Sequence, residues 1–351
     1  MNLGLHFQLP NHPILTDRQR FRDSIDQAVA ADALGYESVW PIEHHFDAQT
    51  SLLSSPLLLL TAIAERTSRI RLGTAILLAP LHQPLRIASD LATLDVISGG
   101  RVDCGLGRGA DPNQFAGFGV APTPGHGELE TMITTMRRAW TERATGVYPS
   151  PLQRPHPPIR IAANTAETFR WAGQAGFPIL VATHVNSPDR LRDLLALYRY
   201  ERANAGHTVD LDDVTVLAPV FTHHNCRHLR TLVEPGLERI ALALRRKVAG
   251  AAAHVPAGPA GDDRRAVLAA VADRVAEFGY DQLQRQHAAV FDTPANAVAR
   301  LRELGAALGA GRIICWFNPG GLIPHDTVLS AMEQVAVHAG LRDEVGAVGV
   351  R

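Results

Sequence analysis

The chain has 351 residues, of which 46% are hydrophobic and 20% are charged, and its formal net charge is −1. This balance excludes a broad basic surface for nucleic acid or for an anionic membrane. Its three cysteines, Cys104, Cys226 and Cys315, are far apart and lack metal-ligand spacing. We therefore expect free thiols and a reducing, cytoplasmic compartment. The N-terminus enters a strand pattern without a secretory signal, and no apolar run approaches membrane-spanning length.

Short apolar segments alternate with amphipathic segments along most of the chain. The predicted strands cover residues 3–9, 36–42, 70–78, 102–106, 159–163, 179–183, 214–221 and 313–317. The predicted helices cover residues 16–35, 56–66, 85–97, 125–141, 166–175, 188–205 and a last stripe over 328–336. Such nearly continuous apolar strands are typical of a parallel sheet covered on both faces. Eight of them predict an α/β fold, a single (β/α)8 TIM-barrel domain over 1–351, with an open doubly wound sheet as the alternative.

A segment of about 70 residues, 223–292, interrupts this alternation after the seventh strand. It contains helical patterns at about 227–250 and 264–280 and a Pro/Gly/Ala-rich linker at 255–261. The loops that follow barrel strands lie at the catalytic end of the fold. The insertion is therefore either an active-site lid or a solvated helical addition, and its position favours the lid.

The second predicted strand ends in Glu43, His44, His45 and Phe46. Strand ends carry the catalytic residues of barrels, and histidine exchanges protons near neutral pH. Because successive strand side chains point to opposite faces, we expect His44 on one side and Glu43 with His45 on the other. This separation argues against a metal site, and we predict none. The histidine pair alone is equally compatible with ordinary structural histidines.

Two further strand ends offer groups that bind anions. The fourth strand runs into Gly107, Arg108 and Gly109, where the guanidinium suits a phosphate; a surface arginine in a flexible loop is the alternative. The fifth strand is followed by Asn164 and Thr165, either of which suits the cap of the next helix. A helix N-terminus is also a phosphate site. In a barrel, Arg108 and Thr165 would face the same side and converge on one phosphate.

Several segments, taken in their order and spacing, resemble the bacterial luciferase-like flavin monooxygenase family. The matching segments are residues 36–46, 71–78, 94–101, 107–109, Trp171 and 316–321. The resemblance implies a (β/α)8 barrel that uses reduced FMN (FMNH2) and O2 through a C4a-peroxyflavin to oxygenate a small organic or biosynthetic substrate. It also implies that a separate flavin reductase supplies the reduced FMN, and that the protein is a homodimer.

The resemblance also implies roles for individual residues. His44 matches the catalytic histidine of luciferases. Arg108 matches the arginine that binds the flavin phosphate, and Thr165 and Thr168 match hydroxyl positions at the same phosphate. Asn164 stands where luciferase has an acidic residue, which removes a charge but leaves the backbone role intact.

The peptide bond between Ala75 and Ile76 matches a non-prolyl cis peptide beneath the flavin ring. An apolar wall of this kind is what a flavin ring needs. Two alternatives to the monooxygenase remain. One is an F420-dependent oxidoreductase of the same fold, against which the Glu-His-His-Phe segment argues. The other is a non-catalytic flavin-binding or partner subunit, against which the presence of both His44 and Arg108 argues.

Overall fold

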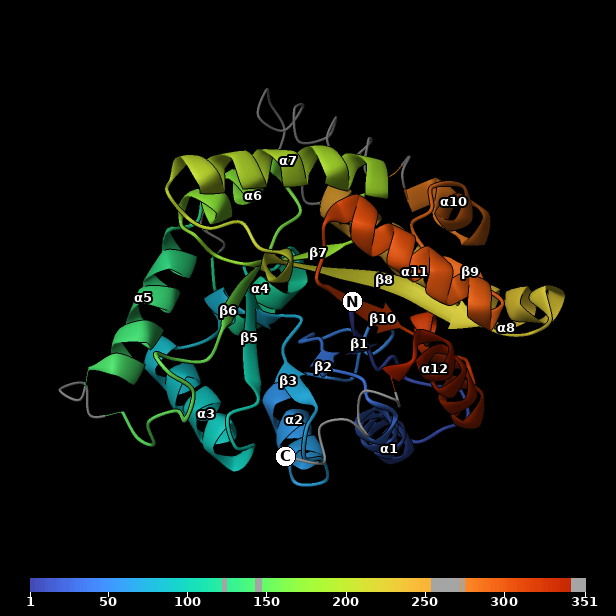
Figure 1. Cartoon of the computed structure of the whole chain (residues 1–351), viewed down its shortest axis with the longest axis horizontal. Helices are drawn as coiled ribbons and strands as arrows, with labels where there is room; N and C mark the ends of the chain where they lie inside the picture. Colours follow the sequence, from blue (N-terminus) through green and yellow to red (C-terminus); the bar gives the residue numbers. More distant parts are fainter. Residues whose placement is uncertain (122–124, 143–146, 254–271, 273–274, 342–351) are drawn as a thin grey trace.

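The chain forms a closed barrel of eight parallel strands surrounded by helices (Figure 1). The computed structural model describes residues 1–121, 125–142, 147–253, 272 and 275–341. The barrel strands are β1 (Asn2–Phe7), β2 (Ser38–Pro41), β3 (Arg71–Gly73), β5 (Val102–Gly107), β6 (Ile159–Ala162), β7 (Ile179–Ala182), β8 (Val214–Thr222) and β10 (Arg312–Trp316). Each pairs with the next, and β10 pairs with both β8 and β1, which closes the sheet. The predicted (β/α)8 barrel is thus confirmed and the open sheet is excluded.

Two short strands extend this barrel. β4 (Leu77–Leu78) pairs with β5, and β9 (Val290–Asp292) pairs with β8. The prediction of one continuous strand over 70–78 was therefore wrong, because β3 ends at Gly73 and pairing resumes only at Leu77. Between them, Thr74 Oγ1 donates to the Gly105 carbonyl (2.8 Å) and accepts from the Gly105 N–H (2.9 Å). A side chain thus replaces the regular backbone pairing at this step.

The helices cover the outside of the barrel (Figure 1). They are α1 (Asp17–Leu34), α2 (Pro56–Ala64), α3 (Pro84–Ile97), α4 (Pro112–Phe118), α5 (Gly127–Thr141), α6 (Ala166–Gln174), α7 (Pro188–Asn204), α8 (Cys226–Ala253), α10 (Tyr280–Arg285), α11 (Pro294–Leu308) and α12 (His325–Ala339). α1 begins with a capping box between Thr16 and Gln19 and ends at Gly35, which has φ 87°. α4 was not predicted: Asp111 accepts a hydrogen bond from the N–H of Asn113 and so caps a helix where its Asp-Pro sequence suggests only a turn.

The main core lies between the strands and the surrounding helices, and a smaller cluster fills the barrel itself. Trp40, Leu180 and Ile314 form this inner cluster. The end of the barrel near the strand starts is closed by buried charges, with Asp103 Oδ1 3.0 Å from Arg160 Nε and Asp103 Oδ2 3.5 Å from an Arg312 nitrogen. The interior is therefore filled at one end and in the middle, which leaves the carboxyl ends of the strands for a site.

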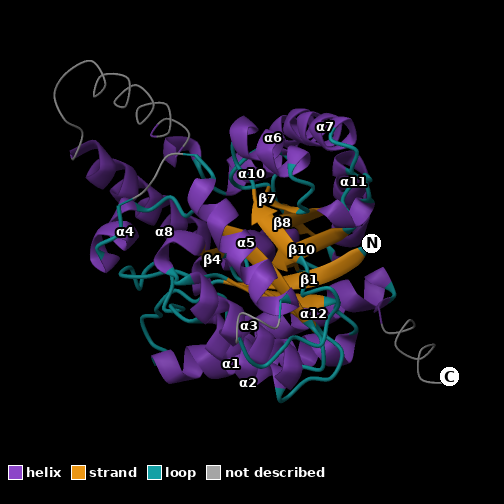
Figure 2. Ribbon diagram, turned by 90° about the vertical axis from the view of Figure 1, so that its left-hand side faces the viewer, coloured by secondary structure: helices purple, strands orange, loops and turns teal. Residues whose placement is uncertain are grey.

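The described part of the insertion consists of α8, α10 and β9. Its linker at 255–261 and most of the predicted helix at 264–280 lie outside the described residues. Figure 2 shows α8 and α4 on one side of the barrel and the chain start at β1 on the opposite side. Cys226, at the first turn of α8, is exposed, whereas Cys104 and Cys315 are buried in strands, where burial raises the pKa of both thiols. Within the described ranges, no helix has the length and apolar character to cross a membrane.

Candidate active site

His44 follows β2 and is buried against α4, where a side-chain amide holds its ring. Gln114 of α4 accepts a hydrogen bond from the backbone N–H of His45 at its Oε1 (3.2 Å). Its Nε2 is therefore directed at Nδ1 of His44, at 3.1 Å. Since Nδ1 accepts this bond, the proton of the neutral ring rests on Nε2.

Burial and a neighbouring ammonium group keep the imidazole of His44 neutral. Burial, followed by the charge of Lys247, lowers the pKa of His44 to about 4, against the opposing effect of Asp111 and Asp47. Lys247 belongs to α8, and its Nζ lies 3.5 Å from Nε2 of His44. The same ammonium group is 3.1 Å from a carboxylate oxygen of Asp111 and 3.9 Å from one of Asp47. The insertion therefore contributes directly to the surroundings of His44.

Glu43 and His45 follow the end of β2 and form a hydrogen-bonded group apart from the side-chain contacts of His44. The Glu43 carboxylate receives hydrogen bonds from His45 Nε2 (2.7 Å), His82 Nε2 (2.9 Å) and the Leu78 N–H (2.9 Å). Burial alone would raise the pKa of Glu43, but these bonds bring it below its ordinary value. The charged carboxylate thus fastens the end of β2 to β4, which is a structural role.

The predicted phosphate groups converge at the start of α6. Thr165 caps this helix, and its hydroxyl lies 3.1 Å from the hydroxyl of Thr168. Arg108 donates to the carbonyl of Gly125 (2.7 Å), and the next residue, His126, places Nε2 3.1 Å from the Thr168 hydroxyl. Arg108 is thus linked to the two threonines indirectly, through Gly125 and His126 of the chain segment before α5.

His126 and Asn164 complete this corner in ways the sequence did not indicate. His126 stacks on Trp171, with ring centroids 4.5 Å apart and an interplanar angle of 11°. Burial, and then the charge of Arg108, lower the pKa of His126. Asn164 is exposed and contributes its carbonyl, which accepts a hydrogen bond from Asn186 Nδ2 (3.0 Å).

The segment between β3 and β4 forms an apolar surface inside the barrel mouth. The Ala75–Ile76 peptide bond is cis, as the resemblance implied. Both residues are partly buried and pack against the inner cluster defined above. A Cβ at Gly107 would lie 2.0 Å from Ile76 Cδ1, and one at Gly105 would lie 1.9 Å from the Thr74 carbonyl oxygen. These two glycines therefore make room for the Thr74–Ile76 segment rather than for a ligand.

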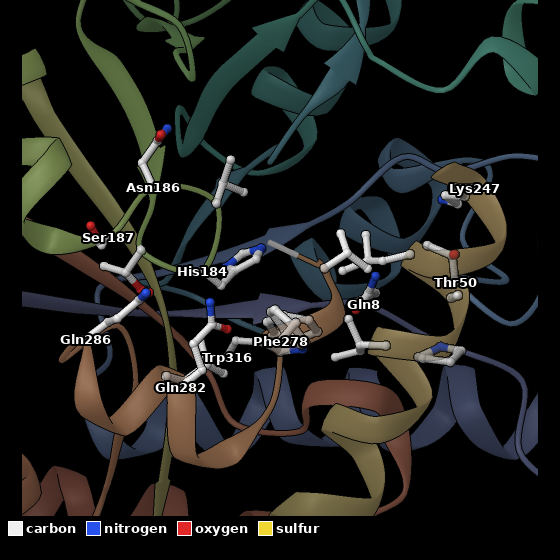
Figure 3. A pocket seen from close by; sticks show the side chains of 18 of the residues that line it. Gln8, Thr50, His184, Asn186, Ser187, Lys247, Phe278, Gln282, Gln286 and Trp316 are labelled. Atoms are coloured by element: carbon white, nitrogen blue, oxygen red, sulfur yellow. The ribbon is translucent and has the colours of Figure 1, made fainter. Parts of the chain in front are cut away.

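A cavity of about 640 Å³ opens beside these groups (Figure 3). It is lined by the ends of β1, β7 and β10 on one side and by α8 and α10 on the other. Its lining does not include His44, Arg108, Ala75 or Ile76. It does include Lys247, next to His44, and Asn186, which bonds the residue before Thr165. The cavity therefore runs between the His44 corner and the α6 corner.

Two histidines, His6 and His184, were missed by sequence reasoning, and both lie beside Trp316, which belongs to the segment 316–321 that resembles the family. The ring centroid of Trp316, at the end of β10, lies 5.7 Å from that of His6 and 5.3 Å from that of His184. Burial lowers the pKa of His6 to about 3 and that of His184 to about 4. Both imidazoles are consequently neutral near pH 7. His6 is a single residue in an apolar strand and His184 is a single residue in the turn after β7, so no local pattern marks either.

Comparisons with known proteins place this chain in a family. Residues 1–311 match the family described as luciferase-like monooxygenase. The oxygenase component of a flavin-dependent trigonelline monooxygenase from Acinetobacter baylyi is 30% identical over 179 residues, 47% of this chain and 49% of that protein. The alignments cover 49% to 67% of the length of this and two other curated relatives.

Solved structures share the fold over nearly the whole chain. Monooxygenase RslO1 from Streptomyces bottropensis has a TM-score of 0.81 and 26% identity, over 96% of this chain and 98% of that one. The oxygenating constituent of 3,6-diketocamphane monooxygenase from Pseudomonas putida, in complex with FMN, has a TM-score of 0.76 and 20% identity, over 97% and 98%. An F420-dependent secondary alcohol dehydrogenase is similar in fold as well, with a TM-score of 0.65 and 16% identity, over 96% and 98%. With the family match extending over residues 1–311, this chain belongs to the luciferase-like monooxygenases.

Proposed function

We propose that this protein is the oxygenase component of a two-component system, which uses FMNH2 and O2 to oxygenate a small organic or biosynthetic substrate. The observation that carries the proposal is the presence of three features beside one cavity, at the end of the barrel where the strands terminate. These are a phosphate corner at α6, an apolar surface at Ala75 and Ile76, and a neutral histidine, His44, on the side of Lys247.

The residues present fit FMN. Arg108 uses one guanidinium nitrogen on the Gly125 carbonyl, which leaves donors for a phosphate beside the hydroxyls of Thr165 and Thr168. The α6 N-terminus adds free backbone N–H groups, and Asn164 precedes its cap. Ala75 and Ile76 would face the ring. Reduced FMN supplies two electrons, so that one atom of O2 enters the substrate and the other leaves as water.

His44 is the residue to which we assign proton handling. Gln114 donates to Nδ1, so the exchangeable proton sits on Nε2, 3.5 Å from Lys247 Nζ. Because both groups are then donors, this contact is a repulsion and not a hydrogen bond. A neutral ring with a pKa of about 4 retains this form throughout the neutral range. α8 and α10 cover the cavity on the side away from the strands, where they would exclude water during turnover. In this sense the insertion at 223–292 would act as a lid.

The partners follow from the same proposal. A relative described as an oxygenase component supports a separate flavin reductase that supplies FMNH2. A homodimer and a cytoplasmic location are part of the proposal. An F420-dependent oxidoreductase is the second candidate, since an enzyme of that kind shares the fold. Oxygen-independent reduction of a substrate by reduced F420 would favour it.

The phosphate role is tested with Arg108→Ala, by measuring the affinities of FMN and riboflavin by calorimetry. Loss of one charge-assisted phosphate contact is expected to weaken FMN binding by roughly 10- to 100-fold and to leave riboflavin binding nearly unchanged. Arg86→Ala, on the exposed face of α3, is the matched control. Equal weakening of both flavins would remove Arg108 from the phosphate site.

The proton-handling role is tested with His44→Ala, by stopped-flow measurement of the reoxidation of bound reduced FMN by O2. Proton-transfer groups typically contribute about 10²- to 10⁴-fold, so a change of at least about tenfold is expected while FMN affinity is retained. His338→Ala, at the exposed end of α12, serves as the control. An unchanged reoxidation rate and product ratio would contradict the assignment of His44.

A further inference from the structure

Polar side chains line the cavity both on the barrel side and on the α10 side. Gln8 Oε1, His184 Nδ1, Gln282 Oε1 and Trp316 Nε1 are buried and have no hydrogen-bond partner among the described residues. All four residues line the cavity, and we call them the polar floor. Figure 3 shows Gln282 extending from α10 toward the loop that carries His184, with Trp316 close by.

These groups come from separate parts of the chain. Gln8 follows β1, His184 follows β7, Trp316 ends β10 and Gln282 lies in α10. Proteins rarely leave buried donors and acceptors unpaired, and such groups concentrated around one cavity indicate a ligand that pairs with them. In the free protein the four atoms are enclosed by neighbouring atoms. A ligand can therefore reach them only when the side-chain amides of Gln8 and Gln282 rotate about their soft terminal torsions.

The charges around the cavity indicate an uncharged ligand. Of the described residues that line it, none is Asp or Glu, and the cations are Lys247, which is paired with Asp111, and Arg190, which is exposed. His184 is neutral because burial lowers its pKa to about 4. A charged ligand of either sign would therefore find no unpaired group of opposite charge in the interior of the cavity.

The walls indicate a flat ligand. Trp316, His184 and Phe278 present aromatic rings to the cavity, and α8 adds the aliphatic side chains of Ile240 and Leu244. Aromatic faces pack best against other flat groups. The cavity is also separate from the Ala75–Ile76 surface and from Arg108, because none of these residues is in its lining.

We infer that this cavity is the substrate site, and that it binds an uncharged ring compound carrying hydroxyl or keto groups on opposite edges rather than a long-chain aldehyde. The polar floor sets this specificity. An aldehyde has a single polar atom, so most of the polar floor would remain as unpaired as in the free protein, whereas each group that a ring ligand pairs strengthens its binding by roughly tenfold. The inference rests on the proposed function, since it names the substrate class of that oxygenase.

The experiment compares ring compounds with an aldehyde on the protein saturated with oxidised FMN, in the absence of turnover. The probes are 1,5-dihydroxynaphthalene, 2,6-dihydroxynaphthalene and n-decanal, and calorimetry gives their dissociation constants. At least one ring probe is expected to bind about tenfold tighter than decanal or more. Equal or tighter binding of decanal, or no binding of either ring probe, would overturn the inference.

Gln8→Met and Gln282→Met remove the hydrogen-bonding atoms at nearly constant volume. Each is expected to weaken the tighter ring probe about tenfold, to leave decanal unchanged, and to leave FMN affinity unchanged. Gln174→Met, exposed on α6, is the control. Loss of FMN affinity in the cavity variants would assign the polar floor to the cofactor and overturn the inference. Failure of the proposed function would appear separately, as FMN binding that does not depend on Arg108.

Discussion

At the scale of single residues, the site depends on contacts that cannot be predicted from the sequence. His44 was predictable because it stands at the end of an apolar strand in a distinctive segment. Its partners were not, because Gln114 and Lys247 lie 70 and 203 residues away. Lys247 sits in an insertion whose pattern indicated helix and nothing more. A side chain that only becomes a neighbour through folding leaves no local signal.

Replacing Lys247 with methionine is expected to raise the pKa of His44 from about 4 toward 6.5. The variant removes the nearby positive charge and leaves Asp111 and Asp47 to favour the protonated ring. Nuclear magnetic resonance titration of the labelled His44 imidazole measures the shift. In the folded protein, the neutral form should then be lost at a higher pH than in the wild type.

Lys247→Arg preserves the charge and is the matched control for this titration. The arginine variant should leave the pKa of His44 close to its wild-type value. If the methionine and arginine variants gave the same titration curve for His44, the positive charge at position 247 would not be what lowers its pKa.

At the scale of elements, regular strands and helices were predictable and the irregular join between β3 and β4 was not. Apolar runs and capping residues such as Thr16 were enough to predict the positions of most strands and helices. Both signals depend on residues that are close together in the sequence. β9 has only three residues, too few to form a pattern. The interruption at Thr74–Ile76 depends on glycines in β5, a different strand. The resemblance to a family, rather than local propensity, identified the cis bond.

The two glycines of β5 should differ in their tolerance of alanine. At Gly105 the new Cβ meets a backbone carbonyl oxygen at 1.9 Å, and backbone cannot move away easily. At Gly107 it meets the far end of the Ile76 side chain at 2.0 Å. We expect Gly105→Ala to reduce the free energy of unfolding by about 3 kcal/mol or more, and Gly107→Ala by about 1 kcal/mol, as measured by urea unfolding.

Removing the obstructing atom provides the control. Ile76→Val deletes Cδ1, so it should restore stability to Gly107→Ala and should not help Gly105→Ala. If both glycine variants lost the same free energy of unfolding, or if Ile76→Val rescued Gly105→Ala, these close contacts would not determine how the Thr74–Ile76 segment packs on β5.

At the scale of the whole molecule, closure of the barrel is what assembles the site. The carboxyl ends of strands distant in sequence meet at one end, so predicting the barrel was enough to expect Arg108 and Thr165 together. The structure joins them through Gly125 and His126, which the sequence did not single out. The polar floor has the same origin, since it comes from three strand ends and one helix of the insertion.

The buried histidines of the barrel should make the fold sensitive to acid. In the folded protein the pKa is about 3 for His6 and about 4 for His184, against 6.5 for an unperturbed imidazole. Unfolding therefore takes up one proton at each of these two histidines below about pH 6.5, so their contribution to stability is present above that pH and is lost as the pH falls toward about 4. The free energy of unfolding should decrease by up to about 3 kcal/mol for each pH unit in this window.

Urea unfolding between about pH 7 and about pH 5 measures this slope. His184→Gln removes one titrating group. It should reduce the slope by about half of the part that His6 and His184 contribute together. His338→Gln, exposed on α12, should leave it unchanged. A wild-type slope equal to that of His184→Gln would indicate that His184 is already protonated when folded.

The distribution of the three cysteines gives the molecule a natural handle for spectroscopy. Cys104 and Cys315 are enclosed in barrel strands, whereas Cys226 is exposed where α8 begins. A maleimide dye or spin label would therefore attach at one position in the native protein, without engineering. That position lies on the helix that carries Lys247 to His44, so the attached label would report on this helix as flavin and substrate bind.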